Sequence, residues 1–157
     1  MAEITKQEIG QRTAVLKRFR ELLKAQRDRF KAYLDILDRQ KDTIEKGAAD
    51  DLIRHVELEE KIVADIFSIQ KVIDPMEEMY RAITGPARQA ADHGEVNSIK
   101  SALNELKKEA VVRSKRNREL LSKRMIELRS EIKSLRSSPY NRQRPAYSNP
   151  SVVDIRG

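Results

Sequence analysis

Apolar residues recur at alternating steps of about three and four along three long stretches of this chain, and this repeat constrains the fold more than any other feature. Such a repeat gathers apolar side chains on one narrow face of an α-helix, where they pack against other helices. The first stretch repeats Leu16, Phe19, Leu23, Phe30, Leu34, Leu37 and Ile44, and the second repeats Leu52, Val56, Val63, Ile66, Ile73, Met76, Tyr80 and Ile83. Polar seam positions fall near Gln26 and Lys41. The pattern predicts an all-α fold, an elongated antiparallel three-helix coiled-coil bundle or hairpin.

The third stretch carries two repeats that differ in phase. The first consists of Val96, Ile99, Leu103, Leu106 and Ala110, and the second of Leu121, Met125, Leu128, Ile132 and Leu135. Between them the seam positions are Arg113 and Asn117, and the second repeat resumes one residue out of phase. Coiled coils use such interruptions to change packing or to expose a surface. We therefore expect residues 113–118 to be the least core-like part of the third helix.

Capping residues indicate where the first two helices begin and end. Thr5 and Glu8 have the spacing of a capping box, in which each side chain satisfies a backbone N–H at a helix start. Gly47 supplies the permissive backbone at which a helix can end. Asp50 is a good N-cap for the second helix because its carboxylate can accept from free amides.

Prolines and glycines organise the rest of the chain. Pro75 lies inside the second repeat and is expected to kink that helix without dividing the domain, whereas Gly85-Pro86 is expected to end it. We expect helices at about 5–46, 51–84 and 95–136 within a helical domain of residues 1–138, followed by an extended basic tail of residues 139–157 that contains Pro and Tyr.

Composition limits the class of protein. The chain has 157 residues, no Cys and only 4% aromatic residues, which suits long helices and leaves no thiol chemistry. Its first residues lack the basic segment and apolar core of a signal peptide, and no run approaches the ~18 apolar residues of a membrane span. We expect a cytoplasmic protein without membrane insertion.

The sequence offers no convincing catalytic or metal-ligating set. A helix-bundle metal site favours Glu three residues before His, but Leu52 precedes His55 and Ala90 precedes His93 at that spacing. His55 and Glu59 are better interpreted as a solvated helix pair. Without a phosphate-binding loop or nucleophile elbow, we expect no enzyme activity and no cofactor.

The net charge of +7 lies at one end of the chain. Residues 113–157 contain 12 basic and 4 acidic residues, while residues 1–112 are nearly balanced. A basic helix can bind nucleic acid through its phosphates. Glu119, Glu127 and Glu131 are interleaved with these basic residues, however, and an apolar repeat runs through the same helix. Nucleic acid is therefore the less favoured partner, and a structural coiled-coil adaptor is a further alternative.

The second repeat of the third helix allows two interpretations. If it is left uncovered by the first two helices, it can bind an amphipathic partner helix through anchors one turn apart. If it is covered, it is simply part of the bundle core. The narrow repeats are equally compatible with an intramolecular bundle and with a homodimer of hairpins.

Several local motifs resemble the FlgN family of flagellar export chaperones. They are Leu22-Leu23 in the first helix, the turn Lys46-Gly47-Ala48-Ala49-Asp50-Asp51-Leu52, and Glu60-Lys61 ahead of another apolar run. The long third helix and a tail containing tyrosine are also similar to that family. The resemblance implies an all-helical chaperone that needs no cofactor.

The resemblance also implies partners and contact residues. FlgN-like chaperones bind the C-terminal amphipathic helices of the hook-filament junction proteins FlgK and FlgL, prevent their premature assembly, and deliver them to the export gate protein FlhA. The family's cargo-binding region corresponds here to Leu103, Leu106, Leu120, Leu121, Met125, Leu128, Ile132 and Leu135. Its gate contact, a tyrosine beyond the last helix, corresponds to Tyr140 or Tyr147. The family pattern does not account for the basic character of the tail.

Overall fold

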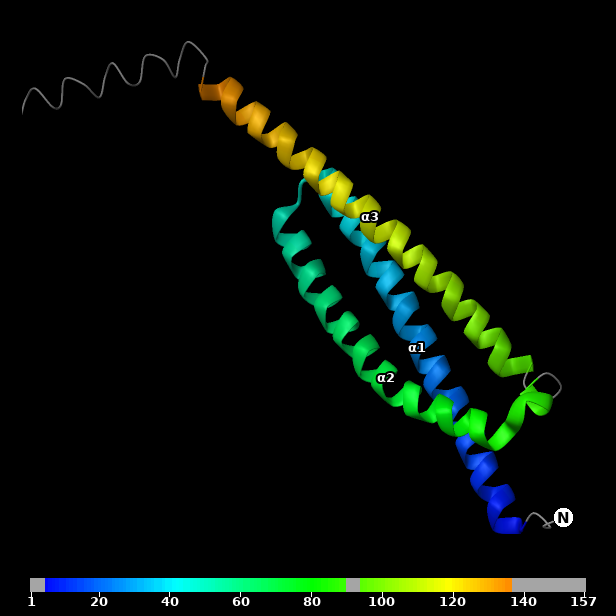
Figure 1. Ribbon diagram of the computed structural model, residues 1–157. Coiled ribbons are helices and arrows are strands. Elements are labelled where there is room, and N and C mark those ends of the chain that lie inside the picture. Colours follow the sequence, from blue (N-terminus) through cyan, green and yellow to red (C-terminus); the bar gives the residue numbers. More distant parts are fainter. Residues whose placement is uncertain (1–4, 90–93, 137–157) are drawn as a thin grey trace, which may run out of the picture. The chain divides into compact units, whose positions relative to one another are not determined.

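The computed structural model describes residues 5–89 and 94–136, including side chains at all of them except 84–89. Three α-helices make up this part of the chain: α1 (Lys6–Lys46), α2 (Ala49–Gln89) and α3 (Gly94–Arg136) (Figure 1). The predicted all-α fold is confirmed. The tail expected at residues 139–157 lies outside the described residues.

The ends of α1 follow its capping residues, as predicted. The Glu8 backbone N–H donates to the Thr5 hydroxyl and the Thr5 backbone N–H donates to the Glu8 carboxylate, both at 3.2 Å. At the other end Gly47 adopts a left-handed conformation with φ 70°. Its N–H donates to the Ile44 carbonyl, and the Ala48 N–H donates to the Thr43 carbonyl, which satisfies two carbonyls of the last turn.

The ends of α2 differ from the prediction. The helix begins at Ala49, so Asp50 lies in its first turn and is not the N-cap. Its negative charge there interacts favourably with the helix dipole. The helix also continues through Gly85-Pro86 to Gln89. A proline removes only one backbone hydrogen bond, so a long helix can continue past it at some cost. The helix is likewise unbroken at Pro75, and Figure 1 shows it bowed along its length.

The chain divides into two units, residues 1–117 and residues 118–157. In the first unit α1, α2 and the beginning of α3 lie side by side (Figure 1). Glu95 contacts Arg20 and Asn117 contacts Leu37, so α3 runs parallel to α1. Gln26 bonds Gln70 whereas Gln40 bonds Glu59, so α2 runs antiparallel to α1. The first unit is therefore an up-down-up three-helix bundle.

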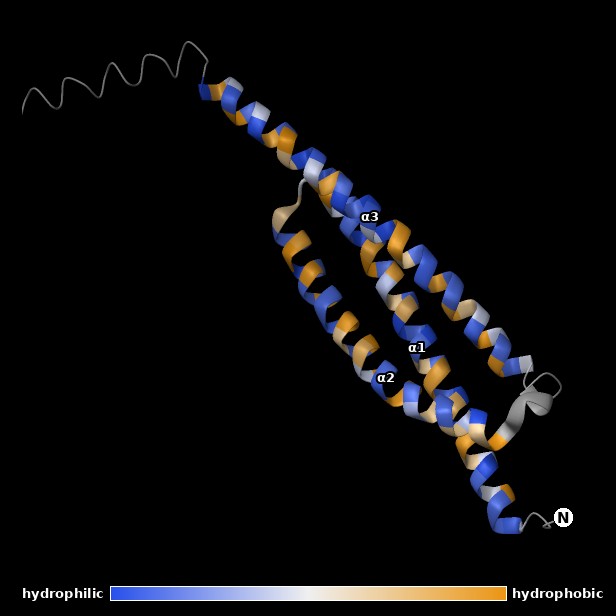
Figure 2. Ribbon diagram, in the orientation of Figure 1, coloured by the Kyte–Doolittle hydropathy of each residue, from blue (hydrophilic) through white to orange (hydrophobic). Residues whose placement is uncertain are grey.

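The core of this bundle draws on all three helices. The Phe19 and Tyr80 rings pack with centroids 4.8 Å apart. Around them lie six further buried side chains, Leu22, Leu23, Ile73, Val96, Ile99 and Leu103. Figure 2 shows hydrophobic and hydrophilic residues interspersed along each helix, as expected for helices that bury part of their surface and expose the rest.

Helix α1 buries two faces, and this explains why one polar seam position lies one residue from the predicted place. Adjacent residues such as Ile36 and Leu37 are both buried, at 2% and 1% exposed, because α1 packs on α2 and α3. Gln26 is buried at 1% exposed, as predicted. The second polar position, predicted near Lys41, is Gln40, one residue earlier, at 5% exposed. One repeat of apolar residues marks one face of a helix, so it cannot reveal that the helix packs against two neighbours on two faces.

The polar stretch at residues 113–118 is also more buried than the sequence suggested. Asn117 is only 5% exposed, and its side-chain amide donates to the Leu37 carbonyl at 2.7 Å and to Gln40 Oε1 at 3.3 Å. Arg113 and Arg116 both donate to the Asp38 carboxylate, at 2.9 and 3.1 Å. This part of α3 is held to α1 by polar contacts, so the expectation that it is the least core-like part of the helix is wrong.

Candidate helix-binding strip

The second unit is described at residues 118–136, where it is helical throughout. None of these residues is buried, and all of the apolar ones except the half-buried Leu120 are exposed. The second repeat of α3 forms a strip whose members are 39% to 64% exposed: Leu121, Met125, Leu128, Ile132 and Leu135. At about 100° per residue, steps of four and three keep all five within an arc of roughly 80°. We call this set the apolar strip.

Charged residues differ on the two sides of the strip. Arg129, Lys133 and Arg136 follow one side. On the other side lie Arg124, Glu127 and Glu131, with Arg124 Nη1 bonded to the Glu127 carboxylate at 3.0 Å. The exposed Ile126 lies well away from the strip on the helix circumference. A partner helix on this strip would therefore meet positive charge on one flank and mixed charge on the other.

Three of the residues predicted as cargo contacts are less exposed than the strip. Leu103 is 5% exposed and belongs to the core of the first unit, so it does not lie on the exposed surface as a cargo contact would need to. Core residues and cargo contacts have the same spacing along a helix, so the repeat alone could not distinguish them. Leu106 and Leu120 are half-buried. The predicted gate-docking residues Tyr140 and Tyr147 lie outside the described residues.

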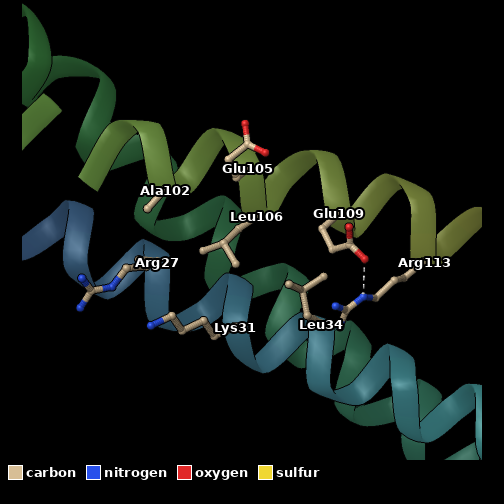
Figure 3. Close-up of a pocket in the computed structure, with 8 residues that line it drawn as sticks. All are labelled: Arg27, Lys31, Leu34, Ala102, Glu105, Leu106, Glu109 and Arg113. Atoms are coloured by element: carbon tan, nitrogen blue, oxygen red, sulfur yellow. Dashed lines mark hydrogen bonds and ion pairs between the residues drawn. The ribbon is translucent and has the colours of Figure 1, made fainter. Parts of the chain in front are cut away.

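A groove between α1 and α3 in the first unit was not predicted. It has a volume of about 710 Å³. Leu34, Ala102 and Leu106 supply its apolar part, Arg27 and Lys31 lie on α1, and Glu105, Glu109 and Arg113 lie on α3 (Figure 3). The ion pairs of Glu105 and Glu109 run along α3, to Lys108 and Arg113, and do not cross the groove. In the sequence, Arg27 and Lys31 are one helical turn apart, and so are Glu105 and Glu109. Each pair lies next to positions of the repeat, and this spacing is the signal that could have indicated the groove.

Two of the basic residues that suggested nucleic acid binding form ion pairs within the protein. Arg113 and Arg116 both bind Asp38, and their side chains are 26% and 32% exposed. They are therefore less available to phosphates than the sequence implied.

The histidine that we interpreted as half of a solvated pair also faces another helix. His55 Nδ1 lies 3.0 Å from the Thr43 hydroxyl. Glu59 instead accepts from Tyr33 at 3.3 Å and from Gln40 at 2.6 Å. The interpretation of His55 and Glu59 as a solvated pair is wrong, because both residues bind α1.

Comparison with known proteins identifies a relative of this chain but no activity. No protein-family model matches the chain, and no solved structure matches it. An uncharacterized protein of Treponema pallidum (strain Nichols) is 31% identical over 137 residues, which is 87% of this chain and 85% of the Treponema protein. This chain belongs to the same family. The family relationship covers most of both chains, so it extends well beyond a single helix.

In this member of the family, none of the helices within residues 5–89 and 94–136 combines the length and the apolar character needed to cross a membrane.

Proposed function

We propose that this chain is a flagellar type III secretion chaperone. It would bind the C-terminal amphipathic helices of the hook-filament junction proteins FlgK and FlgL, prevent their premature assembly, and deliver them to the export gate protein FlhA. The observation that carries the proposal is the exposed apolar strip on α3, where Leu121, Met125, Leu128 and Ile132 are 39% to 52% exposed.

The strip suits an amphipathic helix for a physical reason. Its side chains are one turn apart, which matches the spacing of anchors on a partner helix. Each is about half exposed, so covering it contributes roughly 1 kcal/mol of apolar burial. Four such anchors give about 4 kcal/mol, and the apolar face of the cargo helix, covered at the same time, contributes a similar amount. Micromolar affinity needs about 8 kcal/mol after the cost of association, so contacts to the charged flanks of the strip would add to the binding.

Masking the cargo requires no covalent chemistry. An amphipathic helix that is free in solution exposes apolar surface and can associate with itself. A chaperone that covers this surface keeps the subunit unassembled until export. Delivery to FlhA through Tyr140 or Tyr147 is part of the same proposal and rests on the family resemblance.

The first prediction concerns cargo binding. The full chain mixed with the C-terminal segments of FlgK and FlgL should elute from gel filtration as a stable complex at micromolar concentrations. Met125→Asp with Leu128→Asp should weaken binding at least tenfold, because each buries a charge at an apolar contact. Isothermal titration calorimetry measures the affinity, and circular dichroism measures the thermal midpoint of each variant.

The matched control is Ile126→Asp, which adds a carboxylate at a 63% exposed residue away from the strip. It should leave cargo binding close to that of the natural chain. Absence of any complex would sink the proposal. A collapse of the thermal midpoint in the double variant would instead mean that the strip belongs to a core.

A further inference from the structure

We propose that the apolar strip of one molecule also pairs with the same strip of a second copy, in antiparallel orientation. The pairing would form a short two-fold symmetric coiled coil. It uses four strip residues, Leu121, Met125, Leu128 and Ile132, which are 39% to 52% exposed. The inference does not depend on the proposed cargo, although cargo and second copy would compete for the same surface.

The strip fits the heptad repeat of a coiled coil. With Leu121 and Leu128 at position d, Met125 and Ile132 occupy position a, and the alternating steps of four and three are kept throughout. The residues that flank such a seam are those at e and g. Here Ser122 and Arg129 lie at e, while Arg124 and Glu131 lie at g.

An antiparallel pair satisfies both the apolar and the charged positions. When Met125 lies opposite Leu128 of the second copy, Leu121 lies opposite Ile132, and two-fold symmetry repeats both layers. In an antiparallel coiled coil, a residue at position g faces a g residue of the partner helix, and a residue at e faces an e residue. Arg124 then faces Glu131 of the second copy, and this opposite-charge contact occurs twice. On the other flank Arg129 faces Ser122, so no like charges meet at the nearest e positions.

A parallel pair fits less well. In parallel coils a residue at g faces the next e position of the partner helix. Arg124 would face Arg129, which is repulsive, while Glu131 would face Arg136, which is attractive. The two contacts offset each other, and each occurs twice. The charge pattern therefore selects the antiparallel orientation.

The interface is small, because four apolar layers span only two heptads. Interfaces of this size belong to the weak, transient class. The dimer should therefore form and dissociate readily and depend on protein concentration. A second copy would cover the strip at high concentration, and a cargo helix of higher affinity would displace it.

Sedimentation equilibrium of the full chain over a range of concentrations tests the pairing. A monomer–dimer equilibrium is expected. Arg124→Glu should raise the dissociation constant about tenfold, because it replaces two attractive contacts with two repulsive ones. Combining Arg124→Glu with Glu131→Arg should restore it. Lys123→Glu, the same charge change on the opposite side of the helix, is the matched control and should have little effect.

Cysteine cross-linking tests the orientation, since the chain contains no Cys. A mixture of Met125→Cys and Leu128→Cys chains should form the mixed disulfide under mild oxidation. Parallel pairing would instead give each variant linked to itself, and would make Arg124→Glu tighten the dimer. Either result overturns the proposal, as does a dimer indifferent to Arg124→Glu or a chain that stays monomeric at all concentrations. A monomer that still binds cargo would refute only the pairing, and a dimer without cargo binding would refute only the chaperone function.

Discussion

Asn117 is the residue that most closely fixes how α3 lies on α1 in the first unit. Its amide donates to the Leu37 carbonyl at 2.7 Å and to Gln40 Oε1, and its own oxygen accepts from Arg116. A buried amide with these partners is satisfied in one register only, because a shift along α1 would leave it without acceptors. The contacts therefore specify alignment as well as adding stability.

Replacing this residue gives the third prediction. Asn117→Ala should reduce the free energy of unfolding by about 1–3 kcal/mol, because it removes two donated bonds and leaves buried polar partners behind. Urea denaturation measures the change. Lys115→Ala, at an exposed position on the same helix, should stay within about 0.5 kcal/mol of the natural chain. Equal effects of the two substitutions would argue against a role for Asn117 in alignment.

The residue scale also shows what the sequence could and could not predict. Arg113 and Asn117 were recognised as polar residues at seam positions, but they were interpreted as an interruption. The reason is that their partners, Asp38 and Gln40, lie more than 70 residues away along the chain. Spacing within one helix cannot reveal which residue of another helix faces it.

At the scale of the element, ion pairs hold the beginning of α3 to its neighbours. Glu95 lies 2.8 Å from Arg20 and 3.0 Å from Lys24 on α1. Lys100 lies 2.6 Å from Glu77 on α2. The hydrogen bond from Lys100 lowers the pKa of Glu77 below 4.5, and the bonds from Lys24 and Arg20 likewise lower the pKa of Glu95.

These lowered values give the fourth prediction, a loss of stability in acid. A carboxyl group whose folded pKa is below its unfolded value stabilises the fold fully above about pH 4.5, and this contribution is lost as the pH falls through the folded value. Glu77→Gln should therefore be less stable than the natural chain at pH 7, and the difference should shrink toward pH 3. Urea denaturation at both pH values measures it.

The neighbouring exposed residue supplies the control for this experiment. Glu78→Gln removes one carboxylate beside Glu77, at a residue outside the described ion pairs. It should change the stability little at either pH. A difference for Glu77→Gln that persists unchanged at pH 3 would contradict the assigned ion pair.

Most of the elements themselves were predictable, because their ends depend on local chemistry. The capping box at Thr5 and the end of α1 at Gly47 depend on local chemistry, and both are confirmed. The burial of Gln40 depends on packing between helices, and the continuation of α2 past Pro86 also differs from the prediction. Local signals favour where helices can begin and end, while contacts between helices decide which face is buried.

At the scale of the whole molecule, the two units differ in how their apolar residues are covered. The buried hydrophobic residues of the described chain, from Phe19 to Ala110, all lie in the first unit. The second unit has an apolar repeat of equal regularity, but none of its described residues is buried. The division falls at Asn117, where the sequence already showed a change of phase. The change of phase in the sequence therefore marked the boundary between the two units, although the sequence alone could not show that the second repeat is exposed.

This division gives the last prediction. A chain shortened to residues 1–117 should keep a cooperative thermal transition within a few degrees of the full chain, because it keeps all of the buried hydrophobic residues. It should lose both self-association and cargo binding. A chain shortened to residues 1–136 separates the strip from the tail, and should keep both. Calorimetry and sedimentation compare the three chains. If the shorter fragment unfolds or aggregates, the strip contributes to a core; if it still binds cargo, the binding surface lies in the three-helix bundle, and the α1–α3 groove becomes the candidate.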